Sequence, residues 1–294
     1  MTTAPLEPRI VSGPFWQLTL ADLVRSVRGK GFRLSDVVDL DAAIGFVVAK
    51  GDPVDRARLS FLRTGNSPGE DLLQGCEAGQ TLGGGWPAFY SGRVPSIDAT
   101  CFRLAQLDDL GALGRRPARS ALHWLASRQR LDGTWQEDET LAAAAPPWAQ
   151  PGNPEATLYL TANAGFWLAV TGDYPDNARR AAEVIRDSLQ EDGTWPSFLV
   201  TGWLGAAVLY RQEMFYEAAR MEAVLTERMQ EISPGDAAWL AASLRRAGVS
   251  DDDWALIAAR RRLGQTQRSD GGWSSDDGEA FDVNVALQAI RACR

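Results

Sequence analysis

The sequence is poor in the residue types that most often build metal and nucleophile sites. It has a single histidine, His123, and three cysteines, Cys76, Cys101 and Cys293, which lie far apart. One histidine leaves no partner for a second-histidine metal site. An odd number of distant cysteines suits reduced thiols better than a disulfide framework. We therefore expect a cytoplasmic protein that binds no metal.

Long hydrophobic runs are missing too. No stretch approaches the ~20 apolar residues of a transmembrane helix, and the first residues, MTTAPLEPRIVSG, contain no signal-peptide core. The net charge is −8, and only Lys30 and Lys50 are lysines. An acidic chain of this kind is a poor partner for nucleic acid. These absences predict a soluble protein with no transmembrane segment and no nucleic-acid partner.

A short motif that recurs along the chain is the main feature that the sequence does contain. Residues 129–135 read QRLDGTW and residues 267–273 read QRSDGGW, with Gln, Asp, Gly and Trp at the same spacing. Relaxed copies occur at 80–86, QTLGGGW, and at 190–195, QEDGTW. The distance between copies, roughly 40–60 residues, is in the range of repeated helical hairpins.

Each copy of the motif lies between helical patterns. Before it, apolar residues recur at helical spacing, as in 121–125, and after it come segments that are apolar on all sides, as in 198–210. The unit is an amphipathic outer helix, a turn and an apolar inner helix, which predicts an all-α chain. Because the repeat continues through most of the sequence, we expect a flexible N-terminal arm at 1–14 and a single domain over 15–294.

The first third of the chain carries no clear copy of the motif. Short amphipathic helices are expected there at 18–27, 37–49 and 54–63, with Asp52 and Pro53 at the start of the last one. The relation of these helices to the repeat stays open at this point.

The motif residues have a structural explanation. Glycine allows the positive φ at which a helix can end, and the tryptophan ring can cover the exposed helix end. The aspartates ahead of the glycines, Asp132, Asp192 and Asp270, can accept hydrogen bonds from the backbone that follows. We do not expect these aspartates to be catalytic.

A resemblance to a known family rests on residues 124–135, where an aromatic residue and leucine are followed by Gln and then by DGTW. This pattern resembles the QW repeat of squalene-hopene cyclases and the class II terpene cyclase superfamily. That superfamily shares an α/α toroid, a barrel of inner and outer helices, with the β subunits of protein prenyltransferases. The resemblance implies an α/α toroid and no cofactor. The zinc of the prenyltransferases needs a late histidine, which is missing from the late helix expected at 281–291.

The stretch after the first copy extends the resemblance. In the family, a GGW turn is followed by the motif DxDDT, whose central aspartate protonates an alkene or an epoxide. Here the turn is followed by SIDAT at 96–100, so that Asp98 takes the place of the central aspartate while Ser96 and Ala99 replace the other two. The resemblance implies that Asp98 is the general acid.

Two roles are open for Asp98. A proton-donating carboxyl group must stay neutral and yet acidic, and neighbouring carboxyl groups help to set its proton and its orientation. Asp98 has lost both neighbours, although the hydroxyl of Ser96 can still orient it. The other role is structural, because an aspartate just before the apolar segment that starts at Ala99 can cap an inner helix.

The inner helices predict a hydrocarbon ligand. Helices that are apolar all round leave an apolar central cavity, in which aromatic faces can stabilise carbocations as well as fill space. A proline-rich loop at 142–153 carries Trp148, either as a lid over this cavity or docked on the surface. The acidic pair Asp108 and Asp109 is expected to be solvated at a helix end. The candidate substrate-binding aromatics are Trp86, Phe89, Tyr159, Phe166, Trp167, Phe198, Trp203 and Trp239.

Three functions are consistent with these features. The first is a terpenoid-cyclase-like enzyme that cyclises an isoprenoid, with Asp98 as its general acid. The second is a non-catalytic toroid that binds an isoprenoid or a protein partner. The third is another toroid chemistry such as sugar processing, which would need paired carboxylates across the cleft. Class II cyclases usually have a second toroid, so the resemblance also implies a second toroid subunit or a homodimer.

Overall fold

Helices account for almost all of the regular structure in residues 37–294, which are the residues that the computed structural model describes. The arm expected at 1–14 and the helix expected at 18–27 lie outside the described residues. The helices are α2 (Leu40–Lys50), α3 (Pro53–Thr64), α4 (Glu70–Glu77), α5 (Ile97–Asp109), α6 (Arg116–Arg128), α7 (Pro154–Thr171), α8 (Pro175–Ser188), α9 (Leu199–Arg211), α10 (Phe215–Glu227), α11 (Pro234–Arg246), α12 (Trp254–Thr266) and α13 (Asp282–Cys293).

A few short elements lie between the helices. The strands β1 (Pro87–Ala88) and β2 (Ser91–Pro95) pair antiparallel just before α5. Single 3₁₀ turns occupy η2 (Glu139–Leu141), η3 (Pro147–Ala149) and η4 (Glu279–Phe281). None of the described helices is long and apolar enough to cross a membrane.

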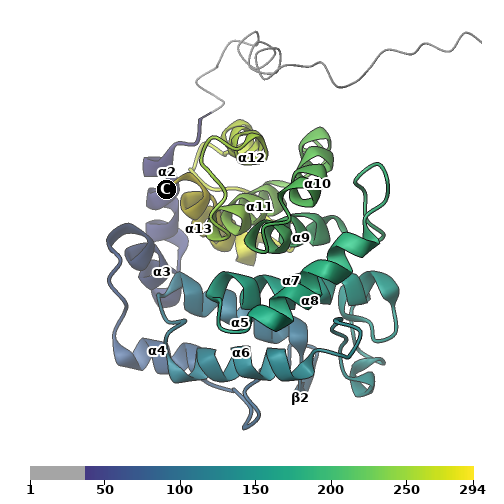
Figure 1. Ribbon diagram of the computed structural model, residues 1–294. Coiled ribbons are helices and arrows are strands. Elements are labelled where there is room, and N and C mark those ends of the chain that lie inside the picture. The colour runs from purple at the N-terminus through teal and green to yellow at the C-terminus, as the bar shows by residue number, and fades with distance from the viewer. Residues whose placement is uncertain (1–36) are drawn as a thin grey trace, which may run out of the picture. The chain divides into compact units, whose positions relative to one another are not determined.

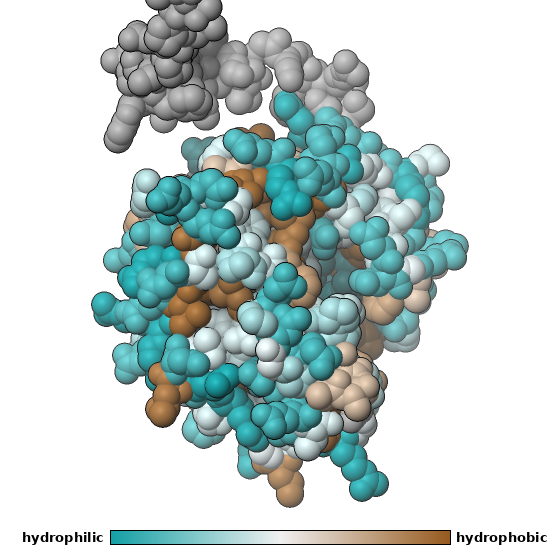
Figure 2. Space-filling view, turned by 90° about the vertical axis from the view of Figure 1, so that its right-hand side faces the viewer, coloured by the Kyte–Doolittle hydropathy of each residue, from teal (hydrophilic) through white to brown (hydrophobic). Residues whose placement is uncertain are grey.

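The helices form an inner and an outer ring (Figure 1). In the inner ring α5 packs on α7, α7 on α9, α9 on α11, and α11 on α13, and α3 closes the ring because it contacts both α13 and α5. The helix α7 is buried on all sides, whereas the outer helix α8 buries mainly one alanine-rich face. Figure 2 shows the side at the right of Figure 1, where hydrophilic residues predominate and hydrophobic ones form separate patches. The all-α toroid predicted from the sequence is thus confirmed.

The glutamines of the motif join neighbouring outer helices. The amide nitrogen Nε2 of Gln129 donates to the glycine carbonyl of its own turn and to Asn177 O at the start of α8, each at 3.0 Å. Gln80 makes the same pair of bonds and reaches the start of α6. The last copy reaches back to the first described helix, because Gln267 Nε2 donates to the carbonyl of Asp39, the N-cap of α2, at 2.9 Å. The helices without a motif copy therefore complete the ring.

The glycine and tryptophan of the motif have the roles that the sequence predicts. Gly133 has a φ of 85° and Gly271 a φ of 87°, and a Cβ at Gly271 would clash with the carbonyl oxygen of Ala42 on α2. The indole Nε1 of Trp135 donates to Leu125 O in the last turn of α6 at 2.8 Å. The Trp135 turn therefore holds the end of one outer helix and lets the next one approach closely. The indole of Trp195 differs, because it donates to Phe198 O at the start of α9.

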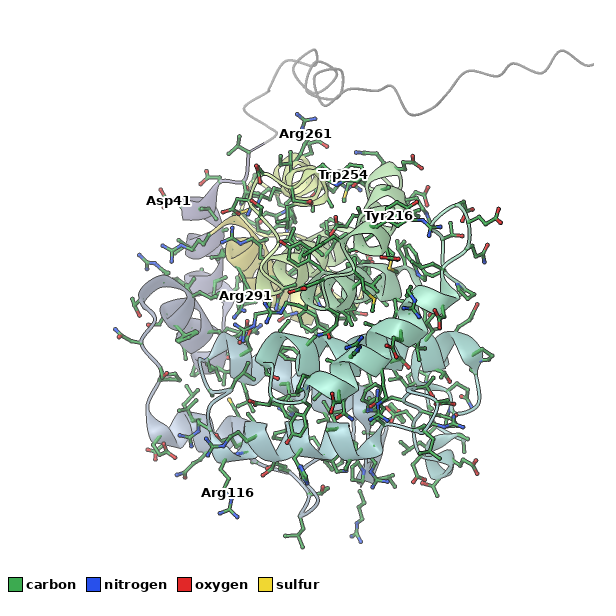
Figure 3. The ribbon with its side chains drawn as sticks, viewed as in Figure 1. Asp41, Arg116, Tyr216, Trp254, Arg261 and Arg291 are labelled. Carbon is green, nitrogen blue, oxygen red and sulfur yellow. The ribbon has the colours of Figure 1, made fainter. Side chains whose placement is uncertain are left out.

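The C-terminal ends of the inner helices are joined by buried ion pairs. Asp109 accepts from Arg58 Nε of α3 at 3.0 Å and pairs with Arg291 of α13 at 2.6 Å, and Asp108 pairs with Arg291 and with Arg246 of α11 at 2.6 and 2.7 Å. Arg291, labelled in Figure 3, is partly buried, with 16% of its side chain exposed. The expectation that Asp108 and Asp109 are solvated was wrong, because both are buried and neutralised by arginines from other helices.

Candidate active site

The N-terminus of α5 brings Asp98 into the ring. The helix begins at Ile97, and its N-cap is Ser96, whose Oγ accepts from Ala99 N at 3.0 Å. Asp98 is the second residue of the helix, and its carboxyl group caps nothing. The capping role considered for Asp98 was therefore wrong, since Ser96 performs it and leaves the carboxyl group free for other contacts.

The carboxyl group of Asp98 is held by two donors. The hydroxyl of Tyr159 on α7 donates to Oδ1 at 2.8 Å, and the indole Nε1 of Trp148 in η3 donates to Oδ2 at 3.2 Å. Asn163 Nδ2, one turn further along α7, donates to the Tyr159 hydroxyl at 3.1 Å. Because the Tyr159 oxygen accepts from Asn163, its hydrogen is directed to Asp98.

The environment of Asp98 raises the pKa of its carboxyl group. Burial is the main cause, since it disfavours the charged form, and the hydrogen bonds from Tyr159 and Trp148 act in the opposite direction. The group therefore keeps its proton to a higher pH than an exposed aspartate, while two donors stand ready to stabilise the carboxylate after the proton has left.

A second carboxylate, that of Glu137, supports the start of α5. Its oxygens accept from Ser96 Oγ at 2.7 Å, from Ile97 N at 2.9 Å and from Asp98 N at 3.0 Å. These backbone donors are among those that a helix leaves unpaired at its N-terminus. Burial raises the pKa of Glu137 to about 6, against the effect of these hydrogen bonds. Glu137 thus fixes the backbone from which the Asp98 side chain projects.

A cavity of about 460 Å³ lies in front of Asp98, within the range of roughly 300–1,000 Å³ that is usual for small-molecule sites. Its walls come from the inner helices α5, α7, α11 and α13, and Trp148 contributes to the wall beside Asp98. Of the two positions considered for Trp148, the structure shows the one over the cavity. The aromatic residues that line the cavity are Phe89, Phe102, Trp148, Tyr159, Phe166, Trp167, Trp239 and Phe281.

The cavity brings together most, but not all, of the aromatics predicted to bind substrate. Phe89, Tyr159, Phe166, Trp167 and Trp239 line it.

The other three candidates lie behind its wall. Trp203 is fully buried and packs edge-on against Trp239, with 5.6 Å between ring centroids. Phe198 packs in the same manner against Tyr159, at 6.3 Å. Trp86 belongs to a motif turn, and its indole donates to a backbone carbonyl in the outer layer, at the end of α4. These rings support the wall without facing the cavity.

The remaining polar side chains of the cavity are mostly acidic or carboxamide groups. Burial, and then the negative charges of Asp276 and Asp277, raise the pKa of Asp236 to about 6. Gln106, Asn284 and Gln288 are the carboxamides of the wall. Within residues 37–294 no group of three or more His, Cys, Asp or Glu side chains is placed to hold a metal ion.

Sequence reasoning missed Glu137, although a signal exists. In the other motif copies the second residue after the tryptophan is Ala88, Ser197 or Ser275, and only here is it an acid. A buried acid so close to a structural turn needs donors, and the start of an inner helix supplies them.

Comparisons with known proteins give structural matches only. No protein-family model matches the sequence, and no curated protein is significantly similar to it. The apo structure of the type II terpene cyclase MstE from Scytonema matches 86% of this chain and 96% of its own, with a TM-score of 0.53 and 14% identity.

Two further structures match over a similar extent. An MstE variant in complex with its substrate, geranylgeranyl dihydroxybenzoate, has a TM-score of 0.52 and 16% identity, over 86% of this chain and 85% of its own. A protein from Actinoplanes has a TM-score of 0.55 and 18% identity, over 87% of this chain and 88% of its own. At such identities the likeness establishes architecture alone. The chain has the helical toroid fold of the type II terpene cyclases.

Proposed function

We propose that this protein is a terpenoid cyclase that starts the reaction by protonating an isoprenoid in its central cavity, with Asp98 as the general acid. The observation that carries the proposal is the carboxyl group of Asp98. It lines an aromatic cavity, its pKa is raised by burial, and it is held by Tyr159 and Trp148 rather than used as a helix cap.

The geometry supports a simple first step. Asp98 transfers its proton to one carbon of an alkene, or to the oxygen of an epoxide, and a cation develops on the adjacent carbon. The Tyr159 and Trp148 donors stabilise the carboxylate that remains. The faces of Phe166, Trp167 and Trp239 can stabilise the cation as the chain folds and new carbon–carbon bonds form. A final proton loss from the substrate ends the reaction.

One toroid is enough for this proposal. The MstE chain is described as a type II terpene cyclase, and the present chain matches 96% of its length. The second toroid subunit or homodimer expected from other class II cyclases stays a prediction, and the proposed chemistry does not depend on it.

Sugar processing is the second candidate, because the cavity wall holds other carboxyl groups besides Asp98. Asp236 also has a raised pKa, and acids of this kind serve glycosidases in pairs. The terpenoid cyclase is favoured because the Asp98 carboxyl group is held by an indole and a phenol and because eight aromatic residues line the cavity.

The test is product analysis of the purified protein with polyprenyl alcohols, polyprenyl diphosphates, squalene and oxidosqualene, beside Asp98→Asn. We expect a cyclised product from the wild type and a loss of at least about 100-fold in Asp98→Asn, because general acid catalysis typically contributes that much. Aryl glycosides are tested in parallel. Binding without any product, unchanged by the substitution, would instead indicate a non-catalytic isoprenoid-binding toroid. Release of the aryl group would indicate a glycosidase.

A further inference from the structure

The cavity has a polar floor about two helical turns away from Asp98. Gln106 lies eight residues after Asp98 on α5, which corresponds to about 12 Å along the helix axis. Asn284 and Gln288 occupy one face of α13, and all three line the cavity. Arg58, which is buried, lines the cavity beside them. We call Gln106, Asn284 and Gln288 the carboxamide floor.

Charged neighbours fix which way each carboxamide points. Arg58 Nη2 contacts the side chain of Asn284 at 2.7 Å, and an arginine can only donate, so Asn284 presents its oxygen to Arg58 and leaves its NH₂ group unused. Gln106 is oriented in the same way by Arg103, at 2.9 Å. Gln288 has the opposite orientation: its Nε2 donates to Oδ2 of Asp109 at 3.5 Å, and its oxygen is left unused.

The floor therefore offers both donors and an acceptor. The NH₂ groups of Asn284 and Gln106 and the Oε1 of Gln288 have no hydrogen-bond partner within the described part of the chain. An unpaired amide in a cavity wall binds water or a polar group of a ligand. A hydroxyl group suits this set, because it accepts from an NH₂ group and donates to a carbonyl oxygen.

The charge of the floor is balanced. Arg58, Arg246 and Arg291 are matched by Asp55, Asp108 and Asp109 in the network beneath it. The other acids in the cavity wall, Asp98, Asp236, Asp276 and Asp277, add negative charge. Among the described residues Arg103, beside Gln106, is in no ion pair, but the four acids of the wall outnumber it. A diphosphate would therefore add several negative charges to a site that is already acidic.

From these contacts we infer that the carboxamide floor binds the hydroxyl group of the substrate, so that the substrate is a prenyl alcohol or another hydroxyl-bearing isoprenoid rather than a prenyl diphosphate. This inference rests on the proposed function, which supplies the reaction of Asp98 with the other end of the substrate. The hydroxyl end binds at Gln106, Asn284 and Gln288, and the chain then extends toward Asp98, where its far alkene or epoxide is protonated.

The test compares three ligands with the same C20 chain, namely geranylgeraniol, geranylgeranyl diphosphate and the hydrocarbon without oxygen. Dissociation constants are measured by quenching of tryptophan fluorescence with the full chain. The variants are Gln106→Met and Gln288→Met, which keep the side-chain length and remove the amide. The control is Gln74→Met, at an exposed position of the outer helix α4, where Gln74 bonds only to Glu70 among residues 37–294.

We expect geranylgeraniol to bind at least about tenfold more tightly than the hydrocarbon, and the two floor variants together to remove most of that difference, because each lost hydrogen bond lowers affinity several-fold. Binding of the hydrocarbon should not change, and Gln74→Met should behave as wild type. Equal affinity for alcohol and hydrocarbon, or tightest binding of the diphosphate, would overturn the inference. If a floor variant does not fold, the comparison of ligands in the wild type still decides.

Product analysis in the same samples separates this inference from the proposed function. Selective binding of the alcohol without any cyclised product supports the floor and contradicts the cyclase. Cyclised products formed equally well from all three ligands contradict the floor and leave the cyclase in place.

Discussion

At the scale of single residues, Asp98 is subject to two opposed influences. Burial raises the pKa of its carboxyl group, whereas the hydrogen bonds from Tyr159 and Trp148 lower it. An acid that protonates an alkene needs both effects on its pKa. It must hold its proton until the substrate is bound and must then release it to a very weak base. The activity should therefore depend on the protonated form of Asp98.

Trp148→Phe tests this balance. The substitution removes the donor to Oδ2 but keeps an aromatic ring in the wall, so the pKa of Asp98 should rise further and its acid strength should fall. We expect a lower kcat, and we expect the loss of activity at rising pH to move to a higher pH than in the wild type. Profiles of kcat against pH measure both effects. Tyr159→Phe should shift the profile in the same direction and further, since Tyr159 has the larger effect on the pKa. A shift to lower pH in either variant would contradict this assignment.

The sequence singled out Asp98 as the candidate acid but did not predict what surrounds it. SIDAT was sufficient to single out Asp98, whereas its two donors lie 50 and 61 residues further along the chain. For Trp148 the sequence left two positions open, over the cavity or on the surface, because nothing in a sequence states which surface a loop covers. Tyr159 was one of eight candidate aromatics, and no feature of the sequence separated it from Trp203, which lies behind the cavity wall.

At the scale of elements, the N-terminus of α5 depends on a residue from the next hairpin. Glu137 accepts from Ser96, Ile97 and Asp98 and so holds the turn that carries the acid. In the family the neighbours of the central aspartate are carboxyl groups of the same motif. Here the carboxylate of Glu137, which contacts that turn, comes from the next hairpin.

Glu137→Gln tests the importance of this contact. An amide NH₂ cannot accept from the donors at the start of α5, so at least one hydrogen bond is lost and a buried donor stays unpaired. We expect the free energy of unfolding to fall by about 1–3 kcal/mol, which is typical of a lost bond to a charged group. Product formation should fall as well, because the backbone of Asp98 is no longer fixed. Thermal denaturation and product assays measure the two effects.

Glu139→Gln is the matched control for this prediction. Glu139 lies two residues further along the same loop and is exposed, so its substitution should change neither quantity. If Glu137→Gln were as stable and as active as Glu139→Gln, Glu137 would have no role in placing the acid.

The elements themselves were largely predictable, and the closure of the ring was not. The recurrence of Gln, Gly and Trp predicts the turns and the pairing of outer and inner helices because each copy acts on residues close to it. The last copy, however, bonds through Gln267 to Asp39, 228 residues away. The chain around Asp39 contains no motif to reveal this, since it contributes only backbone groups to the contact, a carbonyl and an N–H.

At the scale of the whole molecule, several buried acids make folding depend on pH. Burial raises the pKa of Glu137 and Asp236 to about 6 and that of Glu222 to about 8. Unfolded glutamate and aspartate titrate near 4. Between these values the folded state binds more protons than the unfolded state, so its stability falls as the pH rises. We therefore expect the protein to be more stable near pH 5 than near pH 8.

Glu222→Met isolates the largest of these contributions. Glu222 lies on the outer helix α10 and is buried, with Oε1 unpaired within residues 37–294. Methionine does not titrate. The free energy of unfolding of the variant, relative to that of the wild type, should therefore rise between pH 5 and pH 8 by an amount on the order of 2–4 kcal/mol. Urea denaturation at both pH values measures it. Glu227→Met, at an exposed position of the same helix, should show no such growth. A constant difference for Glu222→Met would mean that Glu222 is charged in the folded state.

The closure of the ring also bears on the order in which the chain is made. The helix that borders both α2 and α3 is α13, whose last residue is next to the C-terminus, and the C-terminus lies beside α2 in Figure 1. A growing chain has therefore made Arg58 and Asp109 long before Arg291, which completes their ion pairs, and one wall of the cavity arrives last. During synthesis, Asp98 on α5 therefore has no closed cavity in front of it until α13 has been made and has packed against α11 and α3.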